Sequence, residues 1–210
     1  MLRSICLFSA ALFPLAASAA VTFNIDAQIL RDQSGNPLTS GVVIFAASLT
    51  DDTFGAPTPD AFVTGDDIIL RKWAWDSGSE AGEFQKGGPD GLVFNFNDYS
   101  GLGPDDYLQL YWYPTRSFSD TAPGEGTPYG SFRSDIPEFL GTSAWRVPAD
   151  GSIVSLAFLT QEAGGTRAAT EGDASSFTPV PEPSFYAGAF AVSCLAWAVV
   201  SKKIRRREVV

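Results

Sequence analysis

The chain has 210 residues, with 14 basic and 24 acidic side chains, and its net charge at neutral pH is −10. This acidic excess argues against a nucleic-acid-binding protein, because phosphate contacts require clustered Lys and Arg. The sequence contains no histidine, which removes the commonest general base, the Ser-His-Asp triad and the usual zinc ligands. We therefore expect a protein that is not an enzyme and that needs no cofactor.

The first 19 residues contain the three parts of a secretory signal peptide. Arg3 supplies the positive charge, residues 5–16 form a short apolar run, and Ala17 and Ala19 form an Ala-x-Ala cleavage site. The apolar run is too short to cross a membrane comfortably. We therefore expect the general secretion machinery to export the chain, and signal peptidase to cleave it after Ala19.

Residues 20–160 consist of short segments in which apolar and polar residues alternate, separated by turns rich in Gly and Pro. In residues 21–29, for example, Val, Phe, Ile and Ala alternate with Thr, Asn, Asp and Gln, which is the period of a half-buried strand. Similar or more continuously apolar segments predict further strands at 42–49, 68–75, 92–97, 107–113 and 153–159. The pattern predicts a mainly β domain, folded as an antiparallel β-sandwich of the jelly-roll or immunoglobulin-like kind.

Residues 161–179 differ in composition from the domain before them. They contain Gly164-Gly165, Ala168-Ala169, Ser175-Ser176 and scattered charges, with few large apolar residues. Such a segment has little to bury. We expect it to be a flexible linker.

An uncharged, apolar segment near the C-terminus is followed directly by basic residues. Residues 185–201 are rich in Ala, Val, Phe, Leu and Trp and fall near the short end of the roughly 17–25 residues of a transmembrane helix. Basic residues next to such a helix favour the cytoplasmic side. Here they lie within 202–210 and are Lys202, Lys203, Arg205, Arg206 and Arg207. With the signal peptide, this predicts a single-pass precursor in the inner membrane whose acidic domain lies outside.

The segment 180–184 reads Val-Pro-Glu-Pro-Ser and stands just before this apolar segment. Motif, apolar segment and basic cluster, in this order within the last 31 residues, resemble the PEP-CTERM sorting domain of Gram-negative bacterial surface proteins. The resemblance implies that an exosortase, a membrane-embedded enzyme similar to a cysteine transpeptidase, recognises Pro181, Glu182 and Pro183 and cleaves near them. It also implies release or transfer of the domain to the cell surface or extracellular matrix, often in strains that make exopolysaccharide. Residues 208–210 depart from the pattern, because the basic cluster more often ends the chain.

The predicted strand 107–113 supplies the candidates for an alternative function, binding of carbohydrate or exopolysaccharide. Alternation places Leu108, Leu110 and Trp112 on one face, which favours packing in the core. The opposite face carries Gln109 and aromatic rings that could stack on sugars. The candidate glycan contacts are Tyr107, Tyr111 and Tyr113.

Three acidic pairs, at 51–52, 66–67 and 105–106, lie near ends of predicted strands. Calcium favours loop carboxylates, but the sequence has no Asp-x-Asp-x-Asp-Gly loop and nothing singles out one pair. We therefore assign no metal ligand.

An exported polysaccharide hydrolase is a third function class, since such enzymes use two carboxylates. With so many acidic residues the spacing has no diagnostic value, and we assign no catalytic residue.

Overall fold

The computed structural model describes residues 20–50, 52–75, 80–149 and 151–175. Within these ranges the regular structure is eight β-strands and four short 3₁₀ turns, which confirms a mainly β protein. None of the helical segments in the described ranges is long and apolar enough to span a membrane. The expected signal peptide, sorting motif and transmembrane segment lie outside the described residues.

The first sheet is built around strand β1 (Val21–Gln28). On one edge, β1 pairs in parallel with β8 (Ile153–Leu159) along most of its length. On the other edge it pairs antiparallel with two short strands in turn, β4 (Phe84–Lys86) and β5 (Leu92–Phe94). The expectation of a purely antiparallel fold is therefore wrong for this sheet.

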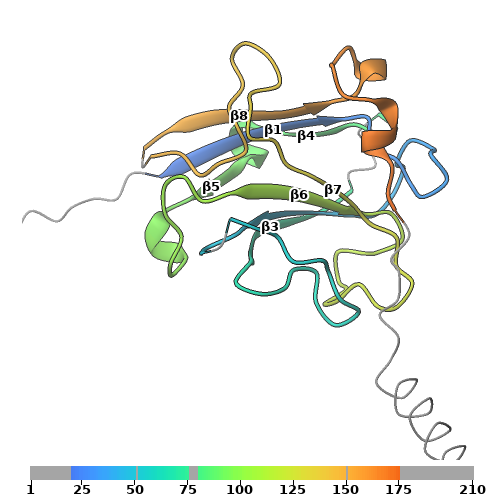
Figure 1. Cartoon of the computed structure of the whole chain (residues 1–210), viewed down its shortest axis with the longest axis horizontal. Helices are drawn as coiled ribbons and strands as arrows, with labels where there is room; N and C mark the ends of the chain where they lie inside the picture. The colour runs from blue at the N-terminus through green and yellow to red at the C-terminus, as the bar shows by residue number, and fades with distance from the viewer. Residues whose placement is uncertain (1–19, 51, 76–79, 150, 176–210) are drawn as a thin grey trace, which may run out of the picture.

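The second sheet has the order β3-β2-β6-β7 and is antiparallel throughout. Its strands are β3 (Ile68–Ala74), β2 (Val42–Ala47), β6 (Leu108–Tyr113) and β7 (Gly130–Phe132). Figure 1 shows the two sheets as two layers, with β8, β1 and β4 in one and β6, β7 and β3 in the other.

The main core fills the space between the two layers. Phe23 of β1 meets Phe45 of β2 edge to face, with ring centroids 5.4 Å apart. Phe158 of β8 stacks on Phe132 of β7, with centroids 4.0 Å apart. Trp112 lies in this core with its neighbours on alternate positions of β6, as the sequence predicted. Burial of these large side chains is the main stabilising contribution to the fold.

A second, smaller cluster covers the outer face of the second sheet. Val42, Ile44 and Ala46 of β2 pack there with Phe62 from the loop between β2 and β3. Strand β2 is therefore buried on both faces, which explains why its residues are continuously apolar instead of alternating.

The segment expected to be a flexible linker packs against the strands over residues 161–175. It forms two 3₁₀ turns, Gln161–Ala163 and Ala169–Gly172. The buried Arg31 side chain donates from Nη1 to the carbonyl oxygen of Ala169 at 2.7 Å and forms an ion pair with Glu162. The linker interpretation is wrong for these residues. The segment supplies hydrogen-bond and ion-pair partners to the buried Arg31 guanidinium, and a buried charge without such partners would be costly. Residues 176–179 lie outside the described ranges.

Candidate functional site

Two of the three tyrosines expected to contact glycans are buried. Tyr111 is 1% exposed and Tyr113 is 0% exposed, beneath the loops that cover the second sheet. The Tyr113 hydroxyl donates to the carbonyl oxygen of Phe62 at 2.9 Å, and burial raises the pKa of both phenols. Neither ring can stack on a polysaccharide in this fold, so the sequence prediction is wrong for both.

Tyr107 precedes β6 and is partly exposed, but cations already occupy its ring. The guanidinium groups of Arg146 and Arg133 lie 3.9 Å and 4.8 Å from the ring centroid. Arg146 also donates to the Tyr107 hydroxyl. These contacts stabilise the loop packing, and a sugar would have to compete with them for the Tyr107 ring.

Described members of the three acidic pairs seen in the sequence interact electrostatically in the fold. Burial raises the pKa of the Asp106 carboxyl, and the negative charges of Asp52, Asp105 and Asp66 raise it further. Within the described ranges, however, no three potential metal ligands come close enough together to hold an ion. Asp51 lies outside those ranges. The cluster is therefore electrostatically repulsive, and we assign it no function.

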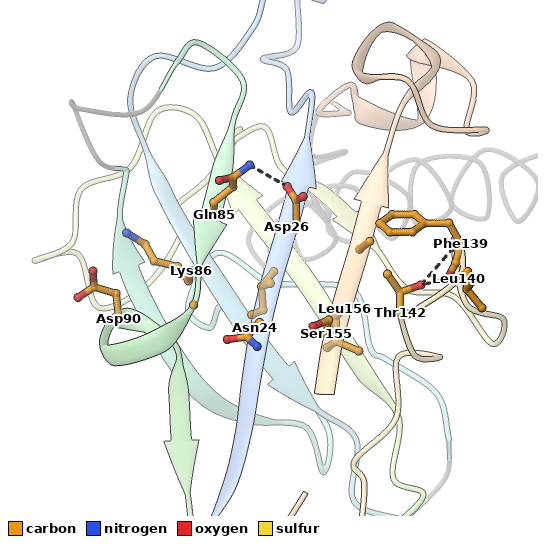
Figure 2. Close-up of a pocket in the computed structure, with 14 residues that line it drawn as sticks. Asn24, Asp26, Gln85, Lys86, Asp90, Phe139, Leu140, Thr142, Ser155 and Leu156 are labelled. Carbon is orange, nitrogen blue, oxygen red and sulfur yellow. Dashed lines mark hydrogen bonds between the residues drawn. The ribbon is translucent and has the colours of Figure 1, made fainter. Parts of the chain in front are cut away.

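A groove lies on the outer face of the first sheet, away from the core. Its volume is about 570 Å³, and it runs across β4, β1 and β8 between the 3₁₀ turn at 88–90 and the loop at 139–142. Figure 2 shows polar side chains rising from the strands and the loop bordering β8 on the far side. This size falls within the range of small-molecule sites in proteins. We call it the outer-face groove.

The floor of the outer-face groove is a row of polar side chains set by strand alternation. Asn24 and Asp26 point outward from β1 because Phe23, Ile25 and Ala27 point into the core. In the ladder, Asn24 lies opposite Ser155 of β8, and Asp26 lies opposite Gln85 of β4. These four side chains are the groove floor: Asn24, Asp26, Gln85 and Ser155.

Hydrogen bonds hold the floor side chains in place. Oδ1 of Asp26 accepts from Nε2 of Gln28 at 2.6 Å and from Nε2 of Gln85 at 3.3 Å. Oδ1 of Asn24 accepts from the Gly88 N–H at 3.2 Å, which links the strand to the 3₁₀ turn at the groove margin. The floor is thereby preorganised for a ligand that forms hydrogen bonds.

The far wall of the groove is apolar and is held by a turn. Phe139 is 49% exposed and Leu140 is 100% exposed. The Thr142 hydroxyl donates to the Phe139 carbonyl at 2.8 Å and accepts from the Phe139 N–H at 3.1 Å, which closes the turn. Just before it, Glu138 has a 2% exposed side chain that pairs with Arg167 at 2.8 Å. A partly buried ion pair thus anchors a wall whose apolar tip faces solvent.

Sequence reasoning missed the outer-face groove. Alternation in residues 21–29 correctly places Asn24 and Asp26 on the outward face, but it cannot show which outward face is later bordered by a loop. The only available signal was the pair Phe139-Leu140 in a segment without strand periodicity. Neighbouring large apolar residues exposed together can mark a binding surface.

Comparisons with protein-family models, with curated proteins and with solved structures returned no match to this chain.

Proposed function

We propose that this chain is a non-catalytic exported protein, which an exosortase sorts to the cell surface or extracellular matrix through its C-terminal signal. The observation that carries the proposal is the order of the tail: Pro181-Glu182-Pro183, an apolar segment at 185–201 and the basic cluster. On this view the precursor is held in the inner membrane with its acidic domain outside, and processing near Pro183 removes the tail.

Contacts of the residues just before 176 are compatible with this division. Ser175 forms an isolated bridge with Tyr129, in which the Ser175 N–H donates to the Tyr129 carbonyl at 2.8 Å. The neighbouring Ala174 is buried in the main core. These contacts precede Val180 in the sequence, so cleavage near Pro183 would leave them intact.

The motif itself is suited to recognition by an enzyme. Proline fixes φ near −65° and disfavours helix at the residue before it. Pro181 and Pro183 flank Glu182, so we infer that the motif stays extended and presents one carboxylate. The two layers around one core support the interpretation of the exported domain as a β-sandwich of the jelly-roll or immunoglobulin-like kind.

Replacing Glu182 tests the sorting proposal. In a host that carries an exosortase, we expect Glu182→Ala to accumulate as uncleaved precursor in the inner-membrane fraction, because the variant removes the only charge in the motif. Immunoblots of membrane and extracellular fractions would show the shift. Glu208→Ala is the matched control, since it removes an acidic residue that lies beyond the basic cluster. Normal processing of Glu182→Ala, or equal failure of both variants, would contradict the proposal.

A further inference from the structure

We propose that the outer-face groove binds a neutral, hydroxyl-rich polysaccharide chain. Its floor offers hydrogen-bonding side chains, and its far wall offers a half-exposed aromatic ring and a fully exposed leucine. Figure 2 shows Phe139 and Leu140 on the loop beside β8. Sugars have the same two kinds of surface, because hydroxyl groups surround the ring while C–H groups cover its faces. Pockets that combine apolar walls with a few fixed polar groups are typical ligand sites.

The floor retains hydrogen-bonding capacity after its internal contacts are made. Asn24 uses Oδ1 to accept from Gly88, whereas its Nδ2 donates to none of the other residues in the described ranges. The Ser155 hydroxyl likewise forms no side-chain hydrogen bond within those ranges. These groups lie opposite each other on adjacent strands. Together with the Asp26 carboxylate they provide both donors and acceptors, as sugar hydroxyls require.

The charges that line the groove favour an uncharged ligand. Lys86 is the one basic residue among the lining residues, and Asp26 and Asp90 are acidic. Residues 20–179, which contain the groove, have 8 basic and 22 acidic side chains. A polyanion such as a nucleic acid or an acidic polysaccharide would therefore be repelled at long range.

The backbone around the groove argues against an extended peptide as the ligand. A peptide strand usually adds to an exposed sheet edge, where unpaired N–H and C=O groups are available. The floor strand β1 is paired on both edges, with β8 on one side and with β4 and β5 on the other. A ligand must therefore rely on side chains, which suits a polysaccharide better than a peptide strand.

The aromatic wall is built to stay in position without a ligand. The Arg167 guanidinium donates hydrogen bonds from Nε to the Glu138 carboxylate and from Nη2 to the Ser134 hydroxyl, each at 2.8 Å. Figure 2 shows the Phe139 ring projecting from the loop toward β8, beside the floor. A wall that is already ordered loses little conformational entropy on binding. A ring held in this way can stack on the C–H face of a sugar unit.

Binding to polysaccharides tests the inference directly. The full chain would be purified in a zwitterionic detergent without sugar groups, then run in affinity gels containing xylan, galactomannan, mixed-linkage β-glucan or anionic alginate. We expect retardation by at least one neutral polymer and none by alginate. Phe139→Ala should weaken that binding by about two- to tenfold, the range expected for one aromatic contact. Asn24→Asp should weaken it similarly, because Asp keeps the acceptor for Gly88 but loses the Nδ2 donors.

Phe118→Ala is the matched control for the aromatic variant. Phe118 is 58% exposed, close to the exposure of Phe139, and it contacts Lys72 of the second sheet instead of the groove. Its variant should bind as tightly as the unmodified chain, and thermal melts would show that all variants fold.

Three results would overturn the inference. The first is absence of retardation by every neutral polymer, and the second is equal loss of binding in Phe118→Ala and Phe139→Ala. The third is self-association that Leu140→Ala abolishes while no polymer binds, which would make the groove an interface between copies of the chain. None of these results bears on processing at Glu182, so this inference and the sorting proposal can fail separately.

Discussion

Gly130 in β7 lies directly opposite Trp112 in β6, and the Trp112 ring occupies the space beside it. A Cβ atom at position 130 would overlap Cε2 and Cζ2 of that ring more closely than real Cβ contacts allow. The ring has no room to move, because Trp112 is fully buried and its Nε1 donates to the Arg31 carbonyl at 3.0 Å. We expect Gly130→Ala to lower the free energy of unfolding by about 1–3 kcal/mol, the usual cost of overpacking a core.

Denaturant unfolding followed by tryptophan fluorescence would measure this loss. Gly103→Ala is the control, because a Cβ atom there meets nothing within 4 Å. The explanation would be wrong if the two variants unfolded at the same denaturant concentration.

Residues of one strand show how far a pattern predicts side-chain positions. Alternation correctly assigned Trp112 to the core with Leu108 and Leu110. The same alternation assigned Tyr111 and Tyr113 to the opposite face, which is also right, but that face is covered by loops. Alternation along a strand specifies which side of the sheet a residue faces. It cannot specify whether a distant part of the chain folds over that side.

At the scale of elements, the segment 161–175 depends on one buried cation. The Arg31 side chain contacts Ala169 and Glu162 of this segment, and the Arg31 backbone forms hydrogen bonds with the backbone of Gly172 and Ala174. We expect Arg31→Met to loosen the segment, because the variant loses the side-chain contacts with Ala169 and Glu162. The strands should remain folded, since their own backbone hydrogen bonds persist.

Amide hydrogen exchange would detect this local change. Amides of 167–174 should exchange several-fold faster in Arg31→Met, whereas amides in β2 and β6 should keep their protection. Arg71→Met is the control, since Arg71 lies on the exposed side of β3. Unchanged exchange in 167–174 would mean that the Arg31 side chain does not hold the segment.

The elements divide into those with a sequence signal and those without one. The predicted segments 21–29, 42–49, 68–75 and 153–159 each contain a strand of six to eight residues. Strands β4 and β7 were not predicted, because three residues are too few to display a period and their flanking residues extend no alternation. The equally short β5 was found because alternation continues past it to residue 97. The parallel pairing of β1 with β8 was not predictable either, since pairing direction follows from the path of the chain and not from local composition. The same limit hid the groove, whose floor and wall come from four separate segments of the chain, around Asn24, Gln85, Phe139 and Ser155.

At the scale of the whole molecule, the two faces of the domain differ in a way that no single element shows. The outer face of the second sheet is sealed by loops over Tyr111 and Tyr113. The outer face of the first sheet is left open as a polar groove. A face sealed by the chain's own loops cannot contact a ligand, whereas an open face can. The open face is therefore the one on which binding is proposed.

Under the proposed processing, the domain must hold its fold together without a disulfide. Its two cysteines, Cys6 and Cys194, lie in the segments that processing is proposed to remove. Stability then rests on the buried core alone, which a domain of this size can supply. We expect the protein recovered from outside the cell to melt at the same temperature with and without dithiothreitol. Differential scanning fluorimetry would measure this, with Cys194→Ser as the comparison. A drop on reduction that is absent from Cys194→Ser would show that the tail persists and joins two copies, which contradicts its removal.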